Sequence, residues 1–354
     1  MVDHELYMRR CIELAKLGAG NVAPNPMVGA VLVYNDEIIG EGFHKKFGEA
    51  HAEVNCIKSV LDTNQKFISK STLYVSLEPC AHFGKTPPCA DLIIDNKIKQ
   101  VKVGCTDSFE KVNGEGIKKL LAAGIKVDVG ILESECRILN KRFFTFHTKK
   151  RPYIILKWAQ SQDGFITGKN LTTTKISNIY TDKLVHKWRS QEAAILVGSN
   201  TVRIDNPYLT TRKWLGKNPV RIIIDEHLKI DANANVFNNE SYTIIINSQK
   251  NFSYINTEYL QINFEKSVVE STLNCLYNKQ LNSVIIEGGS RTLKYFIDAG
   301  FWDEARVITN TDLFLNAGLK SPVLSNQKLN YSFNILNDKI DIFQHNQHDA
   351  LQHD

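Results

Sequence analysis

The sequence predicts an α/β protein with two domains, in each of which helices cover a β-sheet. Three observations lead to this prediction. The chain has 354 residues, which is enough for two or three domains of ordinary size. Segments with helical and with strand-like apolar spacing alternate along both halves. A basic run ending in proline (149–152) interrupts this alternation, so we place the domains at 1–148 and 149–354.

The first half begins with an amphipathic helix over 4–18, because apolar residues recur at helical spacing and Gly18 supplies a stop. A tight turn at 35–36 then separates two strands, 28–34 and 37–41. The pattern next predicts, in order, a helix at 51–60, a strand at 71–79, a helix at 89–96, a strand at 101–106, a helix at 114–123, a strand at 125–130 and a helix at 132–147.

The second half repeats the alternation. The predicted strands are 153–159, 193–198, 220–224, 242–247 and 283–287, and the predicted helices are 180–190, 267–279 and 291–299. The stretch 231–265 is rich in Asn, and apart from the strand at 242–247 we assign no element to it. The polar end after about 343 is expected to be frayed. We find no internal repeat.

Composition narrows the class of protein. The net charge of +5 suits anionic small ligands, and without a long Lys/Arg block it does not predict nucleic-acid binding. The N-terminal segment lacks the apolar core of a signal peptide, and the apolar runs are too short to cross a bilayer, so we expect no membrane association. Seven cysteines without a secretion signal indicate thiols or metal ligands in a reducing, cytoplasmic setting.

Two motifs predict a catalytic zinc site. His51 opens a helix, and Cys80 and Cys89, each preceded by proline, flank a loop of eight residues. A catalytic zinc takes three protein ligands and leaves a fourth position for water, so we expect these three side chains to bind one zinc ion per chain. Glu53 follows His51 by two residues and is expected to carry protons between that water and the substrate. His-x-Glu followed by Pro-Cys and a second cysteine is a general signature of zinc deaminases.

Two other interpretations of these motifs stay open. His51 and Glu53 are also typical of ordinary helix starts. A structural zinc site is usually closed by four ligands, and His82 lies in the loop where it could be the fourth.

The first half resembles a cytidine-deaminase-like three-layer domain. The stretches "APNPMVGAVLV" (23–33), "GFHKKFGEAHAEVNCI" (42–57) and "PCAHFGKTPPCA" (79–90) are similar to those of the bifunctional deaminase/reductase family of riboflavin biosynthesis. The resemblance implies hydrolytic deamination of 2,5-diamino-6-ribosylamino-4(3H)-pyrimidinone 5′-phosphate at zinc. It also implies that Asn25 and His44 contact this substrate and that His82 and Lys85 lie near its phosphate.

Asn25 also suits a pyrimidine on chemical grounds, because its amide offers both a donor and an acceptor. The alternative is a turn residue between two prolines.

The second half resembles the reductase domain of the same family, a dihydrofolate-reductase-like α/β domain. The similar stretches are "LKWAQSQDGFITG", "WRSQEAAILVGSNTVRIDNPYLTTR" and "VIIEGGSRTLKYF". The resemblance implies NADPH-dependent reduction of the ribosyl group to a ribityl chain. The matching cofactor positions are Ala159, Lys175, Thr201, Asp205, Gly289, Ser290, Arg291, Thr292, Leu293, Lys294 and Tyr295. The matching substrate positions are Thr173, Arg189, Leu209, Arg212 and Glu287, and Lys157 is added because it shares a strand face with Ala159.

Some of these positions can be judged by their chemistry. Arg189 and Arg212 suit a phosphate, which guanidinium groups bind in a two-pronged manner, although either could be a surface arginine. The glycine turn at 288–289 before a helix can present N–H groups to a phosphate, or be a plain turn. Many relatives carry tryptophan where this chain has Lys175, which puts that cofactor contact in doubt. No G-x-G-x-x-G is present, so we expect no Rossmann dinucleotide site. The sequence does not locate a site for the cofactor's 2′-phosphate, and NADPH rather than NADH is implied by the resemblance alone.

Two rival functions are compatible with parts of the sequence. One is a nucleoside or tRNA deaminase fused to an inactive reductase-like domain, against which the modest charge and the long cysteine loop argue. The other is a non-enzymatic, zinc-stabilised ligand sensor, which would have no use for Glu53. The resemblance further implies a homodimer, or a higher homo-oligomer, joined through the second domain.

Overall fold

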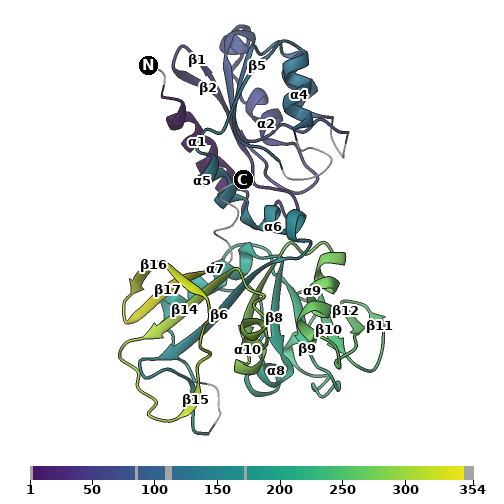
Figure 1. Cartoon of the computed structure of the whole chain (residues 1–354), viewed down its shortest axis with the longest axis vertical. Helices are drawn as coiled ribbons and strands as arrows, with labels where there is room; N and C mark the ends of the chain where they lie inside the picture. Colours follow the sequence, from purple (N-terminus) through teal and green to yellow (C-terminus); the bar gives the residue numbers. More distant parts are fainter. Residues whose placement is uncertain (1–2, 84–86, 108–113, 171–173, 347–354) are drawn as a thin grey trace. The chain divides into compact units, whose positions relative to one another are not determined.

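The computed structural model describes residues 3–83, 87–107, 114–170 and 174–346. Contacts divide the chain into two compact units, 1–150 and 151–354. This division lies two residues after the boundary predicted from the sequence. Each unit is described by itself (Figure 1).

The first unit is built on a five-stranded sheet with the strand order β2-β1-β3-β4-β5. Strand β1 pairs antiparallel with both β2 and β3, whereas β3, β4 and β5 run parallel. The strands are β1 (Gly29–Tyr34), β2 (Glu37–Phe43), β3 (Thr72–Leu77), β4 (Gln100–Cys105) and β5 (Lys126–Val129).

Helices cover both faces of this sheet, and Figure 1 shows α1 and α5 on one side with α2 and α4 on the other. Alternate residues of β1 explain the arrangement: Val31 and Val33 pack with α1, while Ala30 and Leu32 pack with Ala52 of α2. The helices are α1 (His4–Lys16), α2 (Ala52–Lys58), α3 (Cys89–Asp95), α4 (Glu115–Ala122), α5 (Glu133–Leu139) and α6 (Lys141–Lys149), with a 3₁₀ segment η1 (Asp62–Lys70). The three-layer domain predicted for this half is confirmed.

The second unit holds a ten-stranded sheet, ordered β11-β12-β10-β9-β8-β13-β6-β14-β17-β16. The strands from β12 through β14 in this order run parallel, and antiparallel strands extend both edges. The strands are β6 (Tyr153–Ser161), β8 (Ala194–Gly198), β9 (Val220–Ile224), β10 (Thr243–Asn247), β11 (Phe252–Tyr254), β12 (Thr257–Gln261), β13 (Ser283–Gly288), β14 (Glu304–Asn310), β16 (Gln327–Ile335) and β17 (Asp338–His345), beside a small β7 (Phe165–Gly168)–β15 (Gly318–Lys320) pair.

Helices also pack on both faces of this larger sheet. Leu273 and Phe296 belong to one apolar cluster, and Val185 and Val202 belong to the cluster on the other face. The helices are α7 (Ile179–Gln191), α8 (Ser199–Asp205), α9 (Val268–Asn278) and α10 (Ser290–Asp298), with a 3₁₀ turn η2 (Asn235–Phe237). The α/β fold predicted for this half is confirmed.

Several element predictions were wrong or incomplete. The helix predicted over 132–147 is two helices, because the chain turns at Asn140. Helix α8 and the strands β7, β11, β12, β14, β15, β16 and β17 were not predicted. Strand β16 has mostly exposed residues, so it carries little of the apolar alternation on which strand prediction depends. Strand β17 ends at His345, slightly beyond the point where fraying was expected, and residues 347–354 lie outside the described residues.

The basic run between the units also has a structural use. Arg151 donates two hydrogen bonds, of 2.6 and 2.8 Å, to the fully buried carboxylate of Asp303. The N–H of Ile154 donates to the same carboxylate at 2.8 Å. These bonds fasten the start of β6 to the residue before β14.

Across the described ranges, no helix has both the length and the apolar character needed to cross a membrane.

Candidate active sites

The three predicted zinc ligands come together at the ends of secondary-structure elements. His51 directly precedes α2, Cys80 follows β3, and Cys89 is the first residue of α3. The ligand atoms of these residues all lie within 4.8 Å of one another. His51 Nδ1 lies 3.6 Å from Cys80 Sγ and 3.3 Å from Cys89 Sγ. Tetrahedral zinc bonds place ligand atoms roughly 3.5–3.8 Å apart, so the spacing suits one zinc ion.

The electrostatics of the two cysteines also suit a metal. The backbone N–H of Cys89 donates to Cys80 Sγ at 3.3 Å. Hydrogen bonds from the thiol of Cys89 and from His51, acting against burial, lower the pKa of the Cys80 thiol to about 4. A thiolate is the form of cysteine that binds metals. His82 is outside the ligand group in the described part of the chain, so the closed, four-ligand alternative receives no support.

Glu53 lies in the first turn of α2 and is 3% exposed. Its Oε2 is buried and has no hydrogen-bond partner among the described residues. Burial, and then the negative charge of Cys80, raise the pKa of this carboxyl. Because a buried carboxyl oxygen without a partner is costly, Glu53 fits a site in which a zinc-bound water supplies the missing hydrogen bond.

Asn25 and His44 lie beside the zinc ligands, and the rings of His44 and His51 meet edge to face at 5.2 Å. His44 Nδ1 lies 3.1 Å from the carbonyl oxygen of Ala50, and its Nε2 lies 3.2 Å from Asn25 Nδ2. A carbonyl can only accept, so Nδ1 carries the proton and Nε2 accepts from the Asn25 amide. Burial lowers the pKa of His44, in agreement with this neutral form.

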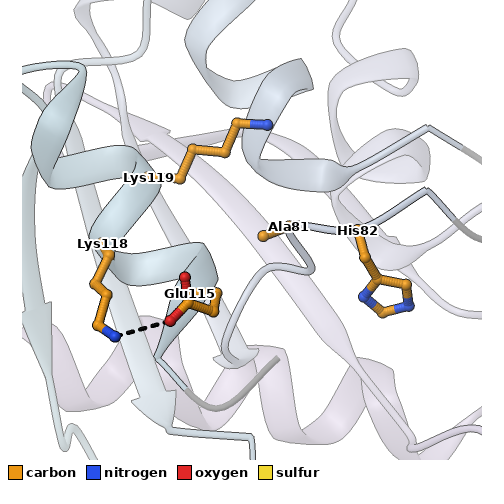
Figure 2. Close-up of a pocket in the computed structure, with 5 residues that line it drawn as sticks. All are labelled: Ala81, His82, Glu115, Lys118 and Lys119. Carbon is orange, nitrogen blue, oxygen red and sulfur yellow. Dashed lines mark hydrogen bonds and ion pairs between the residues drawn. The ribbon is translucent and has the colours of Figure 1, made fainter. Parts of the chain in front are cut away.

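His82 lines a cavity of about 520 Å³ together with Ala81, Glu115, Lys118 and Lys119. Figure 2 shows His82 and Ala81 on the loop that follows Cys80, across from the ion pair between Lys118 and Glu115. Lys119 points toward α3 and pairs with Asp91 at 2.5 Å. The predicted phosphate residue Lys85 lies outside the described residues.

In the second unit, a buried carboxylate organises the predicted substrate residues. Glu287, in β13, is 4% exposed on its side chain. Arg189 donates from Nε and Nη2 to its two oxygens, at 2.7 and 2.8 Å, and Lys157 Nζ lies 3.4 Å away. Burial alone would raise the pKa of Glu287, but the charges of Arg189 and Lys157 outweigh it and lower the pKa to about 2.

This ion pair changes the expected role of Arg189, because the guanidinium fork predicted for a phosphate is occupied by Glu287. Arg189 Nη1 also donates to the carbonyl oxygen of Thr210 at 3.2 Å, and Arg212 Nη1 donates to Thr210 Oγ1 at 3.3 Å. Thr210 therefore brings the two arginines together, and Arg212 is the exposed one. Leu209 is 3% exposed and belongs to the core.

The predicted cofactor positions gather where two strands end. A Cβ on Gly288, at the end of β13, would lie 3.0 Å from Thr201 of α8, and one on Gly198, at the end of β8, would lie 2.5 Å from Thr292 of α10. The two strand-to-helix turns thus interlock, and this packing requires glycine. Gly289 precedes α10, and no side chain caps the first N–H groups of that helix.

The other cofactor positions lie in β6, α8 and α10 or, for Lys175, between elements. Ala159 lies in β6, Ser290 and Arg291 open α10, and Asp205 ends α8. Arg291 Nε donates to Tyr295 Oη at 2.5 Å, Lys294 pairs with Asp298, and Leu293 is in the core. Lys175 is exposed, and Thr173 lies outside the described residues.

Sequence reasoning missed two buried charged residues that hold these sites in place. Glu78, at the end of the predicted strand 71–79, accepts hydrogen bonds from four backbone N–H groups, those of Asp107, Gly114, Gly116 and Ile117, at 3.0–3.3 Å. It thereby fixes the start of α4 beside the residue that precedes Cys80. A charged residue within an apolar strand was the available signal.

The second missed residue is Arg221 in β9, which is fully buried. Its guanidinium donates to the backbone carbonyls of Tyr208, Val236, Asn238 and Ser241 at 2.9–3.4 Å. It joins the segment around Leu209 to the part of the Asn-rich stretch that precedes β10.

Comparison with known proteins decides the family. The cytidine and deoxycytidylate deaminase zinc-binding region matches residues 1–105, and the RibD C-terminal domain matches residues 152–313. The riboflavin biosynthesis protein RibD of Aquifex aeolicus is 41% identical over 302 residues, which cover 84% of each chain. The RibD protein of Actinobacillus pleuropneumoniae is 35% identical over 90% of this chain and 86% of its own. This chain belongs to the RibD family.

Solved structures agree with this assignment. A deaminase/reductase from Thermotoga maritima, described as a diaminohydroxyphosphoribosylaminopyrimidine deaminase and 5-amino-6-(5-phosphoribosylamino)uracil reductase, superposes with a TM-score of 0.89. It is 37% identical and is aligned over 96% of this chain and 98% of its own. RibD of Acinetobacter baumannii gives a TM-score of 0.86 at 29% identity, with the same coverage. This RibD family member is thus a bifunctional enzyme of riboflavin biosynthesis, with a zinc-dependent deaminase domain and an NADPH-dependent reductase domain.

The ion pair at Glu287 predicts a pH dependence of stability. A carboxyl group whose pKa falls from 4.5 to about 2 on folding stabilises the fold above pH 4.5, and this contribution is lost as the pH drops toward 2. The free energy of unfolding of the wild type should therefore decrease more steeply between pH 4.5 and 2 than that of Glu287→Gln. Urea denaturation at several pH values measures this difference. Glu265→Gln, at an exposed position, is the control and should follow the wild type; parallel curves for wild type and Glu287→Gln would contradict the ion pair.

Proposed function

We propose that the first unit deaminates the diaminopyrimidine ribosylamine 5′-phosphate with zinc held by His51, Cys80 and Cys89. The observation that carries this proposal is the buried, unpartnered Glu53 Oε2 beside three ligand atoms at zinc-like spacing. A structural site would have no need of such a carboxyl group. Three protein ligands also leave one coordination position open, as in catalytic zinc sites.

When bound, zinc supplies a water acidified to a pKa of about 7, which is a nucleophile at neutral pH. Glu53 would take one proton from this water and give it to the ring nitrogen as the hydroxide oxygen bonds to the amine-bearing carbon. It would then take the remaining hydroxyl proton and give it to the amine, so that the C–N bond breaks and ammonia departs. The raised pKa of Glu53, caused chiefly by burial, favours the uptake of a proton by this carboxylate.

The substrate would lie between the zinc group and the 520 Å³ cavity. The Asn25 amide and His44 hold the edge of the pyrimidine, and His82 lies toward its 5′-phosphate. Lys85 keeps its predicted role in binding that phosphate. The nearby Lys118 and Lys119 add positive charge to that cavity, which suits a dianionic phosphate.

The second unit then reduces the ribosyl group of the deaminated product. When bound, NADPH supplies the hydride, and we place its phosphates at the interlocked turns of Thr201 and Gly289–Tyr295, with Ala159, Lys175 and Asp205 along the cofactor. Exposed Arg212 binds the substrate phosphate, and buried Leu209 supports the segment that carries it. Thr173 keeps its predicted role in substrate binding. The sugar would contact a fixed cluster of ion-paired side chains, formed by Lys157, Glu287 and Arg189.

Three coarser inferences complete the proposal. We place the domain boundary at 148/149, where the basic run begins. None of the seven cysteines, all of which are described, forms a disulfide, and this supports a cytoplasmic enzyme. Strand β16 is a nine-residue edge strand with exposed Leu329 and Tyr331, and such an edge pairs readily with another chain, so we propose a homodimer joined through the second unit.

Incubation of the purified protein with the diaminopyrimidine phosphate, with and without NADPH, tests the two-step activity. Ammonia should appear in both reactions, and NADPH should be consumed only after deamination, because the reductase acts on the deaminated product. Ammonia is measured by a coupled assay and NADPH by its absorbance. Oxidation of NADPH without any release of ammonia would overturn the order of steps. Release of ammonia from adenosine, cytidine or tRNA instead would favour the rival deaminase.

The role of Glu53 is tested by Glu53→Gln, which keeps the shape of the side chain but cannot carry the proton. Zinc content, measured by atomic emission, should equal that of the wild type, and ammonia release should fall by about three to four orders of magnitude. Exposed Glu49→Gln is the matched control and should keep full activity. Loss of zinc from Glu53→Gln would make Glu53 a ligand and contradict the assignment.

Sedimentation equilibrium tests the homodimer. The wild type should sediment as a dimer, and Tyr331→Lys, which places a charge on the exposed face of β16, should weaken association. A wild-type protein that stays monomeric at all concentrations would exclude this interface.

A further inference from the structure

Asn140 has an unusual position for its side chain. It lies between the last residue of α5 and the first residue of α6 and is 2% exposed. Asparagine at such a junction commonly caps a helix with its side chain, yet the Asn140 side chain caps neither helix. The backbone hydrogen bonds of the two helices do not involve this side chain. It forms hydrogen bonds with another part of the fold instead.

That other part is the backbone of Met27. The Met27 N–H donates to Asn140 Oδ1 at 2.8 Å, and Asn140 Nδ2 donates to the Met27 carbonyl oxygen at 2.9 Å. The amide thus pairs with one residue in the manner of a neighbouring strand, and it joins positions 113 residues apart. Aspartate in its place would set a second acceptor against the Met27 carbonyl, and shorter side chains would reach neither group.

Met27 belongs to the loop that carries Asn25. The N–H of Asn25 donates to the Val22 carbonyl at 2.9 Å, and the N–H of His44 donates to the Val28 carbonyl at 2.9 Å. Between these two points, the bonds of Met27 to Asn140 hold the backbone. The path of the chain from Asn25 to β1 is therefore set partly by a residue from the end of the first unit.

From this loop the hydrogen bonds continue to the zinc ligands. Asn25 Nδ2 donates to His44 Nε2, and His44 Nδ1 donates to the carbonyl of Ala50, the residue before His51. Asn55 Nδ2 donates to the same carbonyl at 3.2 Å. Because its NH₂ group is engaged by His44, Asn25 turns Oδ1 away from that ring, as an acceptor for the substrate.

We propose that Asn140 is a positioning residue for deamination. Its two hydrogen bonds to the Met27 backbone set the orientation in which Asn25 meets the pyrimidine. The inference rests on the proposed role of Asn25 and His44 in binding that ring. Asn140 is too deeply buried to touch the substrate, so its effect passes through the loop and falls on substrate binding rather than on the metal.

The test uses Asn140→Asp in the full-length, zinc-loaded enzyme. The KM for the diaminopyrimidine phosphate should rise about tenfold, with kcat reduced much less and zinc content unchanged. Calorimetry in the Glu53→Gln background gives the same answer without turnover: adding Asn140→Asp should raise the Kd for the substrate by a similar factor. Asn96→Asp is the matched control, because Asn96 Nδ2 donates to the Leu92 carbonyl at the far end of α3 and makes no contact with this loop.

Circular dichroism and the zinc content of the same preparation report whether the first unit is folded. Reductase activity on the deaminated intermediate belongs to the second unit and should be unchanged. Should Asn140→Asp fail to fold, Asn140→Ser removes the two hydrogen bonds to Met27 without adding charge. It is expected to raise KM with a much smaller effect on kcat. An unchanged KM and Kd in a folded variant overturns the proposal, as does an equal loss of zinc and kcat, which indicates a purely structural residue. If the wild type itself releases no ammonia, the proposed function fails instead.

Discussion

The cost of burying a carboxylate must be compensated by hydrogen bonds or by an opposite charge, and this constraint organises both sites of the chain. In the second unit the protein provides the compensation itself, since Arg189 and Lys157 face Glu287 from a helix and from the neighbouring strand. In the first unit, Glu53 has a buried oxygen that the described residues leave without a partner. The pKa of Glu287 is lowered and that of Glu53 is raised. One carboxyl is therefore a fixed charge, and the other is ready to move a proton.

Both sites use the same geometric solution, the carboxyl ends of parallel strands. Cys80 follows β3, and the turns at Gly198 and Gly288 end β8 and β13. Strand ends at one edge of a sheet bring together residues that are distant in sequence, and the helices that follow supply N–H groups. Buried anchors then fix the connecting segments: Glu78 fixes the start of α4, and Arg221 fixes the segment near Leu209. The segments that carry the reactive groups are thus fixed by hydrogen bonds from buried residues.

Whether a site residue could be predicted from the sequence depends on whether its signal is local or comes from tertiary contacts. His51, Cys80 and Cys89 could be predicted, because each sits beside a strand or helix whose apolar pattern is strong and local. Asn140 could not, because its partner Met27 lies 113 residues away and no local pattern reveals that pairing. For Glu78, its charge within an apolar strand signalled a special role, but not its distant backbone partners. Arg189 was predicted as a phosphate clamp from its chemistry, but its contact with Glu287 depends on tertiary packing. The exposed strand β16 was missed for a related reason, since its stability comes from pairing with β17 rather than from burial.

The central claim is an open zinc site formed by one imidazole and two thiolates, with Glu53 outside the coordination shell. X-ray absorption at the zinc edge of the purified enzyme tests it most directly. The account predicts two sulfur atoms at about 2.3 Å and two nitrogen or oxygen atoms at about 2.0–2.1 Å, one of them exchangeable water. The shell should be the same in Glu53→Gln. A third sulfur, a second imidazole in the water position, or a shell that changes in Glu53→Gln would contradict it.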